Sequence, residues 1–318
     1  MKYLVTGGAG FIGSNLAEKL LLQDDQVVIL DNFSTGLRQN VRELVSLKKD
    51  LQVIEGDLRD LETCKKACNG VDYVLHQGAL GSVPRSIEHP DATNENNVNG
   101  TLNIFLAARD AGVKRIVFAS SSSVYGNSAT LPKVETMIPN PISPYAASKY
   151  FTEIYARIFG DLYKTEIIGL RYFNVFGRRQ DPNSTYAAVI PIFVKKLMSD
   201  QVPEIHGDGT QSRDFSYVDN VIEANLLACT ASNAACGQIF NIACGARTTL
   251  NDLYKKLAQL LDKNIEPRYI APRTGDVKHS LADISKAKSL LGYSPKYDVF
   301  TGLERAIGWY KKNAPTWL

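Results

Sequence analysis

The sequence predicts an α/β protein built on a doubly wound parallel sheet, with a second, smaller α/β lobe. Two observations carry this prediction. In the first half of the chain, short runs rich in Val and Ile alternate with longer amphipathic stretches, which is typical of parallel strands joined by crossover helices. A glycine-rich turn also follows the first run directly, and ligands of such sheets bind at the carboxyl ends of the strands.

Six runs are expected to form buried strands because they are brief, continuous and apolar: KYLVT, QVVIL, LQVIE, DYVLH, RIVFA and EIIGL. Between them, the sequence predicts helices over Phe11–Leu22, Leu61–Cys68, Thr93–Ala111 and Pro144–Tyr163.

After about Tyr172 the alternation stops, and prolines separate shorter elements. We therefore expect residues 1–172 to form a Rossmann-type dinucleotide-binding domain and residues 173–318 a substrate-binding lobe. One more buried strand, predicted at Gln238–Ala243, is expected to return the segment 215–245 to the first sheet.

Composition narrows the classes of function. Of 318 residues, 44% are hydrophobic and 22% charged, and the net charge is +3; these globular values give no reason to expect a nucleic acid or a membrane as partner. No stretch approaches the roughly 20 apolar residues of a membrane span. The first strand follows Met1 at once, so no targeting segment is expected. The five cysteines suggest reduced thiols in a cytoplasmic protein, and no metal is expected because Cys64 and Cys68 lack a second pair of ligands.

The glycine-rich turn GGAGFIG predicts a dinucleotide site. Gly7 permits the tight turn, Gly10 lets the backbone approach a pyrophosphate, and Gly13 lets the helix pack on the strand; Phe11 and Ile12 lie between them. Asp31 ends the second strand, where a carboxylate binds a ribose diol and repels a 2′-phosphate. This favours NAD over NADP, although Arg38 leaves NADP open.

Tyr145 and Lys149 are four residues apart in SPYAASKYF and therefore on one helix face. An adjacent ammonium stabilises a phenolate, so the pair is predicted to act as a catalytic base. The run SSSSVYG ends an earlier strand, and a hydroxyl there can bridge a substrate and the phenol. Ser121 is the main candidate, with Ser122 and Ser123 as alternatives.

The spacing GGxGxxG resembles the extended short-chain dehydrogenase/reductase superfamily. The resemblance identifies Ser121 by its distance from Tyr125 and implies that Asp57 and Leu58 lie near the adenine and Gln77 and Ala79 near the ribose and phosphates. It extends the expected cofactor-binding set to Asn32, Ser34, Thr35, Gly36, Asn96 and Tyr172, besides Tyr145 and Lys149.

Motifs of the second lobe resemble nucleotide-sugar epimerases, closest to those acting on UDP-N-acetylglucosamine and UDP-N-acetylgalactosamine. The resemblance implies that Asn174 contacts the substrate, that Arg213 and Arg273 bind its diphosphate and that Asp276 binds the uridine ribose. Gly81 and Ser82 would form a small sugar-pocket wall. Ser280 stands where narrower epimerases have a bulky tyrosine, which leaves room for an acetamido group.

Nucleotide-sugar dehydratases of this superfamily carry an Asp-Glu pair, and related decarboxylases a glutamate, where this chain has Ser122 and Ser123. The absence of an acid favours a 4-epimerase. The alternatives are a dehydratase, a decarboxylase, a 5-epimerase, a uronic acid 4-epimerase using Arg85, Arg178 or Arg179, and a non-catalytic NAD-binding sensor. The resemblance also implies a homodimer joined through the helix of Tyr145, with apolar positions at Tyr150, Ile154 and Phe159.

Overall fold

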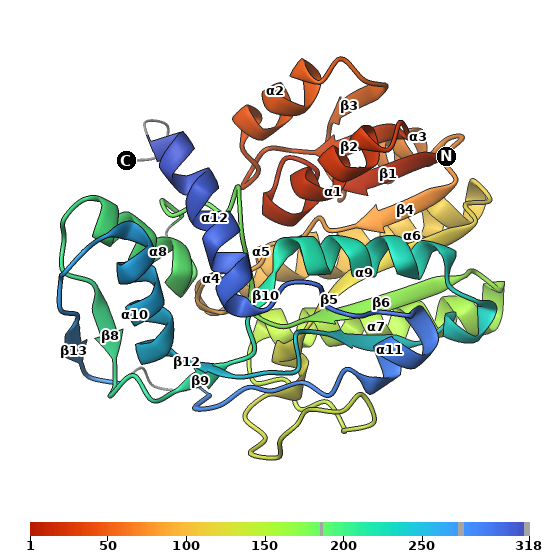
Figure 1. Cartoon of the computed structure of the whole chain (residues 1–318). Helices are drawn as coiled ribbons and strands as arrows, with labels where there is room; N and C mark the ends of the chain where they lie inside the picture. The colour runs from red at the N-terminus through yellow and green to blue at the C-terminus, as the bar shows by residue number, and fades with distance from the viewer. Residues whose placement is uncertain (185–186, 273–276, 315–318) are drawn as a thin grey trace.

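The computed structural model describes residues 1–184, 187–272 and 277–314. Its centre is a seven-stranded parallel sheet in the order β11-β6-β5-β4-β1-β2-β3 (Figure 1). The strands are β1 (Lys2–Thr6), β2 (Gln26–Asp31), β3 (Leu51–Glu55), β4 (Tyr73–His76), β5 (Arg115–Ser121), β6 (Ile167–Tyr172) and β11 (Ile239–Ile242). The order reverses at β1, next to β4, which confirms the predicted doubly wound fold.

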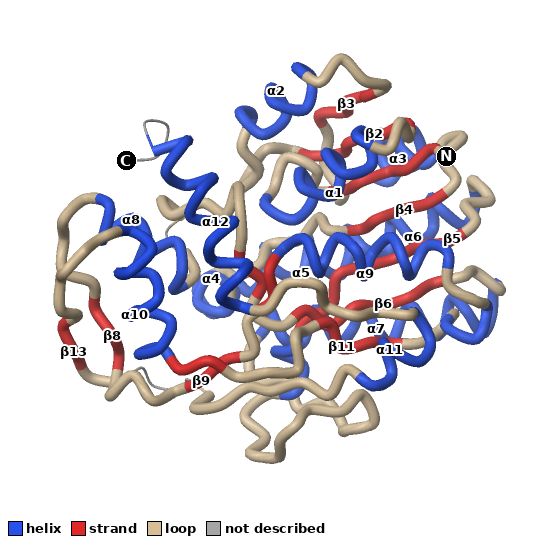
Figure 2. Tube along the Cα trace, in the orientation of Figure 1, coloured by secondary structure: helices blue, strands red, loops and turns tan. Residues whose placement is uncertain are grey.

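Alternate residues of β1 face opposite sides of the sheet. Tyr3 and Val5 belong to a core with helices α1 and α9, whereas Leu4 belongs to a core with α3, α6 and α7. Two helical layers therefore cover the sheet (Figure 2). The elements of these layers are α1 (Phe11–Leu22), α2 (Arg38–Ser46), α3 (Leu61–Cys68), α4 (Val83–Glu88), α5 (Pro90–Asn94), α6 (Gly100–Asp110), α7 (Pro144–Tyr163), α9 (Val218–Thr230), α11 (Ser285–Leu291) and the short turns Ser122–Tyr125 and Asn233–Ala235.

The smaller lobe lies beyond the carboxyl ends of the strands, on the left of Figure 1. Short paired strands and three helices form it, and α10 packs on both α8 and α12. Its elements are β7 (Val175–Phe176), α8 (Val189–Met198), β8 (Glu204–His206), β9 (Ser212–Arg213), β10 (Ser216–Tyr217), β12 (Thr248–Thr249), α10 (Leu250–Leu261), β13 (Arg268–Ile270) and α12 (Val299–Asn313).

The helices α1, α3 and α7 begin and end at the predicted residues. The predicted strand at 238–243 is also confirmed, since β11 pairs with β6 in parallel. The prediction of a buried strand at LQVIE was wrong in burial, because β3 is the sheet edge and only Ile54 of its five residues is buried.

The helix predicted over Thr93–Ala111 is confirmed, but it starts earlier and is not α-helical throughout. The segment begins with α5, continues through a π-helical turn at Glu95–Asn99 and ends in α6. Proline at the first helical position starts α5 at Pro90, which is favourable because that position needs no N–H donor.

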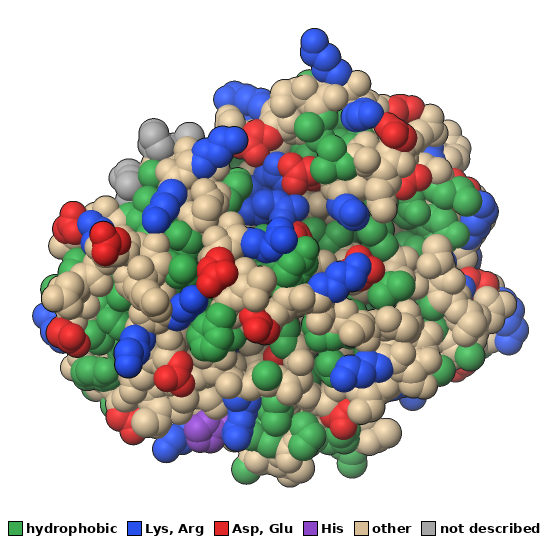
Figure 3. All heavy atoms as spheres, in the orientation of Figure 1, with side chains coloured by type: hydrophobic (Ala, Val, Ile, Leu, Met, Phe, Trp, Pro, Cys, Tyr) green, Lys and Arg blue, Asp and Glu red, His purple; other side chains and the backbone are tan. Residues whose placement is uncertain are grey.

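Charges of both signs are interspersed over the face shown in Figure 3, as the small net charge suggests. None of the helices in the described ranges is long and apolar enough to cross a membrane.

Candidate active site

A cavity of about 950 Å³ opens at the carboxyl ends of the strands. Residues that follow β1, β2, β3, β4, β5 and β6 all contribute to its wall, and so do Arg213 and Ser280 of the second half of the chain. Parallel strands present their carboxyl ends at one edge of the sheet, so residues distant in the sequence meet there.

Most residues predicted for the site line this cavity. The predicted cofactor set contributes Gly7, Gly10, Phe11, Ile12, Gly13, Asp31, Asn32, Ser34, Thr35, Gly36, Leu58, Gln77, Ala79, Asn96, Tyr145, Lys149 and Tyr172. The predicted substrate set contributes Gly81, Ser121, Ser122, Ser123, Asn174, Arg213 and Ser280.

Two predicted residues of the described part of the chain, Asp57 and Ser82, are not in this wall. Asp57 lies behind Asn32, whose amide donates to it at 2.9 Å, and it pairs with Arg59. The hydroxyl of Ser82 caps α4 by accepting from the backbone N–H of Arg85. Arg273 and Asp276 lie outside the described residues.

The glycine turn after β1 leaves an open cradle for a pyrophosphate. Gly7 has φ +66°, and a Cβ on Gly13 would lie 2.1 Å from the Gly7 carbonyl oxygen, so neither position accepts a side chain. In the described chain, no side chain caps the first turn of α1, whose backbone N–H groups remain available to an anion.

Two backbone N–H groups fix the position of the Asp31 carboxylate. The carboxylate accepts from Ala9 N–H at 2.9 Å and from Phe33 N–H at 2.8 Å, and Asp31 lines the cavity. Arg38, the residue that left NADP open, instead pairs with Glu55 and stacks over the Phe33 ring at 4.1 Å. The residues present therefore fit a dinucleotide with an unmodified ribose.

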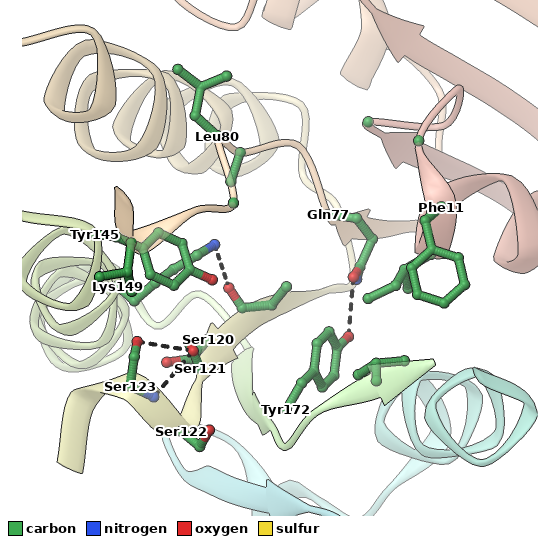
Figure 4. Close-up of a pocket in the computed structure, with 18 of the residues that line it drawn as sticks. Phe11, Gln77, Leu80, Ser120, Ser121, Ser122, Ser123, Tyr145, Lys149 and Tyr172 are labelled. Carbon is green, nitrogen blue, oxygen red and sulfur yellow. Dashed lines mark hydrogen bonds between the residues drawn. The ribbon is translucent and has the colours of Figure 1, made fainter. Parts of the chain in front are cut away.

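Tyr145 and Lys149 lie side by side in the first turns of α7, and both line the cavity (Figure 4). The Lys149 ammonium donates to the Ala119 carbonyl at 2.8 Å, and its burial lowers its pKa to about 8. Burial raises the pKa of the Tyr145 phenol, and a hydrogen bond with Ser121 lowers it. An additional positive charge at the site would favour the phenolate further.

The geometry separates the serines of the β5 end. Ser120 donates to the Glu153 carboxylate at 2.5 Å, so its proton faces away from the reaction centre. Ser121 contacts Tyr145 and accepts from the Ser123 hydroxyl at 2.9 Å (Figure 4). This arrangement favours Ser121 over its neighbours as the group that bridges phenol and substrate.

Several cavity residues carried no signal in the sequence. Lys133, Ile142 and His279 enter the wall because the loop before α7 forms a parallel bridge with the segment before α11, at Lys133 and Ala282. Such a long-range contact has no local pattern. The Lys133 ammonium is buried and donates to the Ser128 carbonyl at 2.5 Å.

A second cavity of about 470 Å³ adjoins the first, and Asn174, Val175 and Arg213 line both. The wall of this second cavity also includes Phe193, Lys196, Glu204, His206, Gln211, Phe215 and Leu250. Arg213 donates to the carbonyls of Ser212 and Lys278, which hold its guanidinium at the boundary.

The arginines considered for a uronic acid do not line either cavity in the described structure. Arg178 pairs with Glu18 at 3.1 Å and Asp219 at 2.6 Å, and Arg179 pairs with Glu18 at 2.7 Å. These pairs join the lobe to α1 and α9.

A Rossmann sheet whose glycine turn, ribose-binding aspartate and Tyr–Lys pair share one cavity defines an NAD-binding enzyme of the short-chain dehydrogenase/reductase class. The model of the NAD dependent epimerase/dehydratase family matches residues 3–243. The chain belongs to this family, and NAD is its cofactor.

Relatives match along nearly the whole chain. A UDP-glucose 4-epimerase of Mycolicibacterium smegmatis is 35% identical over 99% of this chain and 100% of its own. The structure of UDP-N-acetylglucosamine 4-epimerase from Methanobrevibacter ruminantium, in complex with UDP-N-acetylmuramic acid, has a TM-score of 0.93 and 39% identity over 98% of both chains. That of Thermus thermophilus UDP-glucose 4-epimerase with NAD has a TM-score of 0.88 and 35% identity over 98% of this chain and 99% of that one.

Proposed function

We propose that the chain catalyses the reversible C4 epimerisation of UDP-N-acetylglucosamine and UDP-N-acetylgalactosamine, and also accepts UDP-glucose and UDP-galactose. The observation that carries this proposal is the meeting of three features in one cavity: the Tyr145–Lys149 pair, a serine run without a carboxylic acid, and a wall of small residues at Gly81 and Ser280. The names of the relatives support the 4-epimerase activity and include both kinds of sugar.

In this reaction the bound NAD⁺ supplies a reversible hydride acceptor for C4 of the sugar. Tyr145, as phenolate, takes the proton of the 4-hydroxyl, and Ser121 orients that proton through its hydrogen bond to the phenol. Lys149, held by the Ala119 carbonyl, stabilises the phenolate. After the flat 4-keto sugar turns over, Tyr145 gives the proton back to the C4 oxygen. Return of the hydride to the opposite face of C4 inverts that carbon.

The nucleotide must stay anchored while the sugar turns. Arg213 and Asn174 line both cavities and are proposed to bind the diphosphate, with the nucleoside in the second cavity. A charge-assisted clamp on the diphosphate holds the substrate without restraining the sugar. Arg273 and Asp276 are proposed to complete this clamp on the strength of their motifs.

The acetamido preference is supported by free volume. A Cβ placed on Gly81 would meet no atom within 4 Å in the described structure, so this part of the wall leaves room for a larger sugar substituent. Ser280, whose side chain is short, lines the same cavity.

Incubation without added cofactor tests the reaction. The purified protein should convert UDP-N-acetylglucosamine to its 4-epimer faster than UDP-glucose, as followed by NMR. In Ser280→Tyr, kcat/KM for the acetamido sugar should fall at least tenfold more than for UDP-glucose; equal losses would show that Ser280 is no gate. A stable keto sugar or released carbon dioxide would favour a dehydratase or decarboxylase instead.

The enzyme is proposed to be a cytoplasmic homodimer that pairs through α7. Phe151, Ile158 and Leu162 are exposed at 51%, 37% and 68% along one side of this helix, and a second copy of the chain would cover them. The predicted position Phe159 is buried within the subunit instead. A monomer in sedimentation experiments at micromolar concentration would contradict the dimer.

A further inference from the structure

A chain of buried side chains connects the cofactor-binding turn to the catalytic helix. Its members are Thr6 at the end of β1, His76 at the end of β4, Asn97 in the π-helical turn, Thr101 in α6 and Ser148 in α7. Each is at most 4% exposed. Buried polar groups of this kind must satisfy one another.

The first part of the chain fixes the protons of the histidine. The Thr101 hydroxyl donates its single proton to the backbone carbonyl of Asn97, four residues earlier, at 2.5 Å, so at its 2.9 Å contact with His76 Nε2 it can only accept. Nε2 therefore carries the imidazole proton, and Nδ1 accepts from the Thr6 hydroxyl at 2.7 Å. The Thr6 oxygen in turn accepts from Gly78 N–H at 3.1 Å.

The second part reaches the catalytic tyrosine. The Asn97 amide donates to the Ser148 hydroxyl at 3.0 Å, and Ser148 donates to the backbone carbonyl of Tyr145 at 2.8 Å. The same Asn97 side chain binds both backbone groups of Leu80, accepting from its N–H at 2.7 Å and donating to its carbonyl at 3.2 Å. The chain is thus anchored to two parts of the cavity wall before it reaches α7.

Apart from the two bonds of Asn97 to Leu80, which form a side branch, the donors from Gly78 to Ser148 all point toward Tyr145. Gly78 packs against the glycine turn, since a Cβ on Gly7 would lie 2.8 Å from the Gly78 Cα. The imidazole stays neutral because burial, with a smaller effect from Lys149, lowers the pKa of His76 to about 3. A protonated ring would place a second donor against Thr6, whose own proton would then lose its acceptor.

We propose that His76, Thr6, Thr101, Asn97 and Ser148 act as one positioning unit that sets the Tyr145 phenol relative to the cofactor-binding turn. None of these five groups needs to touch the substrate; they act through the Tyr145 backbone. Single hydrogen bonds of buried networks are coupled, so one broken link loosens the whole unit. The π-helical turn serves it by placing Asn97 between Leu80 and Ser148. This inference rests on the proposed role of Tyr145.

The test uses the links at Thr101 and Ser148. Thr101→Val removes the hydroxyl with little change of shape, Ser148→Ala removes the final link, and Thr101→Ser restores the hydroxyl. Thr152→Val is the matched control. The Thr152 hydroxyl is equally buried in α7 but, among the described residues, bonds only the backbone carbonyl of Ser148 within its own helix.

Thr101→Val and Ser148→Ala should each lower kcat about tenfold to a hundredfold, the cost expected of a displaced reacting group, with KM for the UDP-sugar within twofold. The double variant should be no slower than the slower single variant, since both cut the same unit. Thr101→Ser should recover most of kcat, and Thr152→Val should keep it. Any of three results would overturn the proposal. The kcat losses of the two single variants could multiply in the double variant, kcat could be unchanged in Thr101→Val, or Thr152→Val could lose as much kcat as the other variants.

A measurement without substrate separates this inference from the proposed reaction. Hydrogen exchange of the peptide covering residues 76–80 should accelerate about tenfold in both Thr101→Val and Ser148→Ala, and not in Thr152→Val. If the wild-type protein converted no UDP-sugar, the proposed function would be wrong. The hydrogen-exchange result would still show whether the positioning unit exists. An unchanged hydrogen-exchange rate in both Thr101→Val and Ser148→Ala would refute the existence of the positioning unit.

Discussion

Replacing Glu153 by glutamine should destabilise the protein more than most single substitutions. Glu153 lies on α7, four residues after Lys149, and pairs with Arg171 of β6 through bonds of 2.8 and 2.6 Å. The two side chains are 5% and 4% exposed. The Arg171 guanidinium also stacks over the Tyr125 ring at 4.7 Å, and its Nη1 has no hydrogen-bond partner in the described structure.

The expected loss of stability in Glu153→Gln follows from the burial of Arg171. Removing one charge leaves the Arg171 guanidinium buried without a counterion, which typically costs about 3–5 kcal/mol. Glutamine keeps the shape and one acceptor oxygen, so the loss should be near 3 kcal/mol. For a chain of this size that corresponds to a fall in Tm of about 6–12 °C. Turnover at 25 °C should persist because neither residue contacts the proposed reaction centre.

Urea unfolding of the cofactor-free protein measures this loss. Glu304→Gln is the control, because Glu304 pairs with Lys256 but is 54% exposed, and such surface pairs contribute less than about 1 kcal/mol. The double variant Glu153→Met with Arg171→Met should recover much of the stability, since it removes both buried charges. A loss below about 1 kcal/mol in Glu153→Gln would refute the reasoning.

The other predictions concern the cofactor and the pH dependence. Gly13→Ala should abolish NAD binding in calorimetry, because its Cβ would lie 2.1 Å from the Gly7 carbonyl oxygen, whereas Gly308→Ala has open space and should leave binding intact; tight binding to Gly13→Ala would contradict this geometry. Tyr145→Phe should lower kcat at least a thousandfold while NAD and UDP still bind, and undiminished turnover would exclude Tyr145 as the base. Between pH 8 and pH 10.5 the unfolded chain keeps a proton on Lys149 that the folded protein has lost, so the free energy of unfolding should rise with pH by up to about 3 kcal/mol. In Lys149→Met this rise should disappear, and an unchanged rise would show that another group causes it.

Local patterns predicted the elements that depend on local causes. α7 begins at Pro144, directly after Ser143, whose hydroxyl caps the helix by accepting from the Ala146 N–H. Such a cap is visible in the sequence. The π-helical turn was not predictable, because it depends on Asn97 bonding to Leu80 from another part of the chain. β3 looked buried by composition, yet burial of a strand depends on its place in the sheet, which the sequence does not display.

In the candidate site, too, features with a local sequence pattern could be predicted and features that depend on long-range contacts could not. The glycine turn, Asp31 and the Tyr145–Lys149 pair have fixed local spacings with a physical reason, and all line one cavity. Lys133 could not be predicted because only a bridge to Ala282 brings it there. The separate tasks of Ser120 and Ser121 also required the structure, since the partner Glu153 lies 33 residues away in the sequence.

The return of β11 to the sheet has a consequence for dissecting the protein. All six residues of β6 are buried, and β11 is its outer neighbour in the sheet. A fragment ending at residue 172 would leave the hydrogen-bonding groups of β6 without that neighbour, and bare edges of this kind pair with other molecules. Such a fragment should aggregate on expression, so efforts to isolate the nucleotide-binding half need to retain residues 239–242 or to supply a substitute strand.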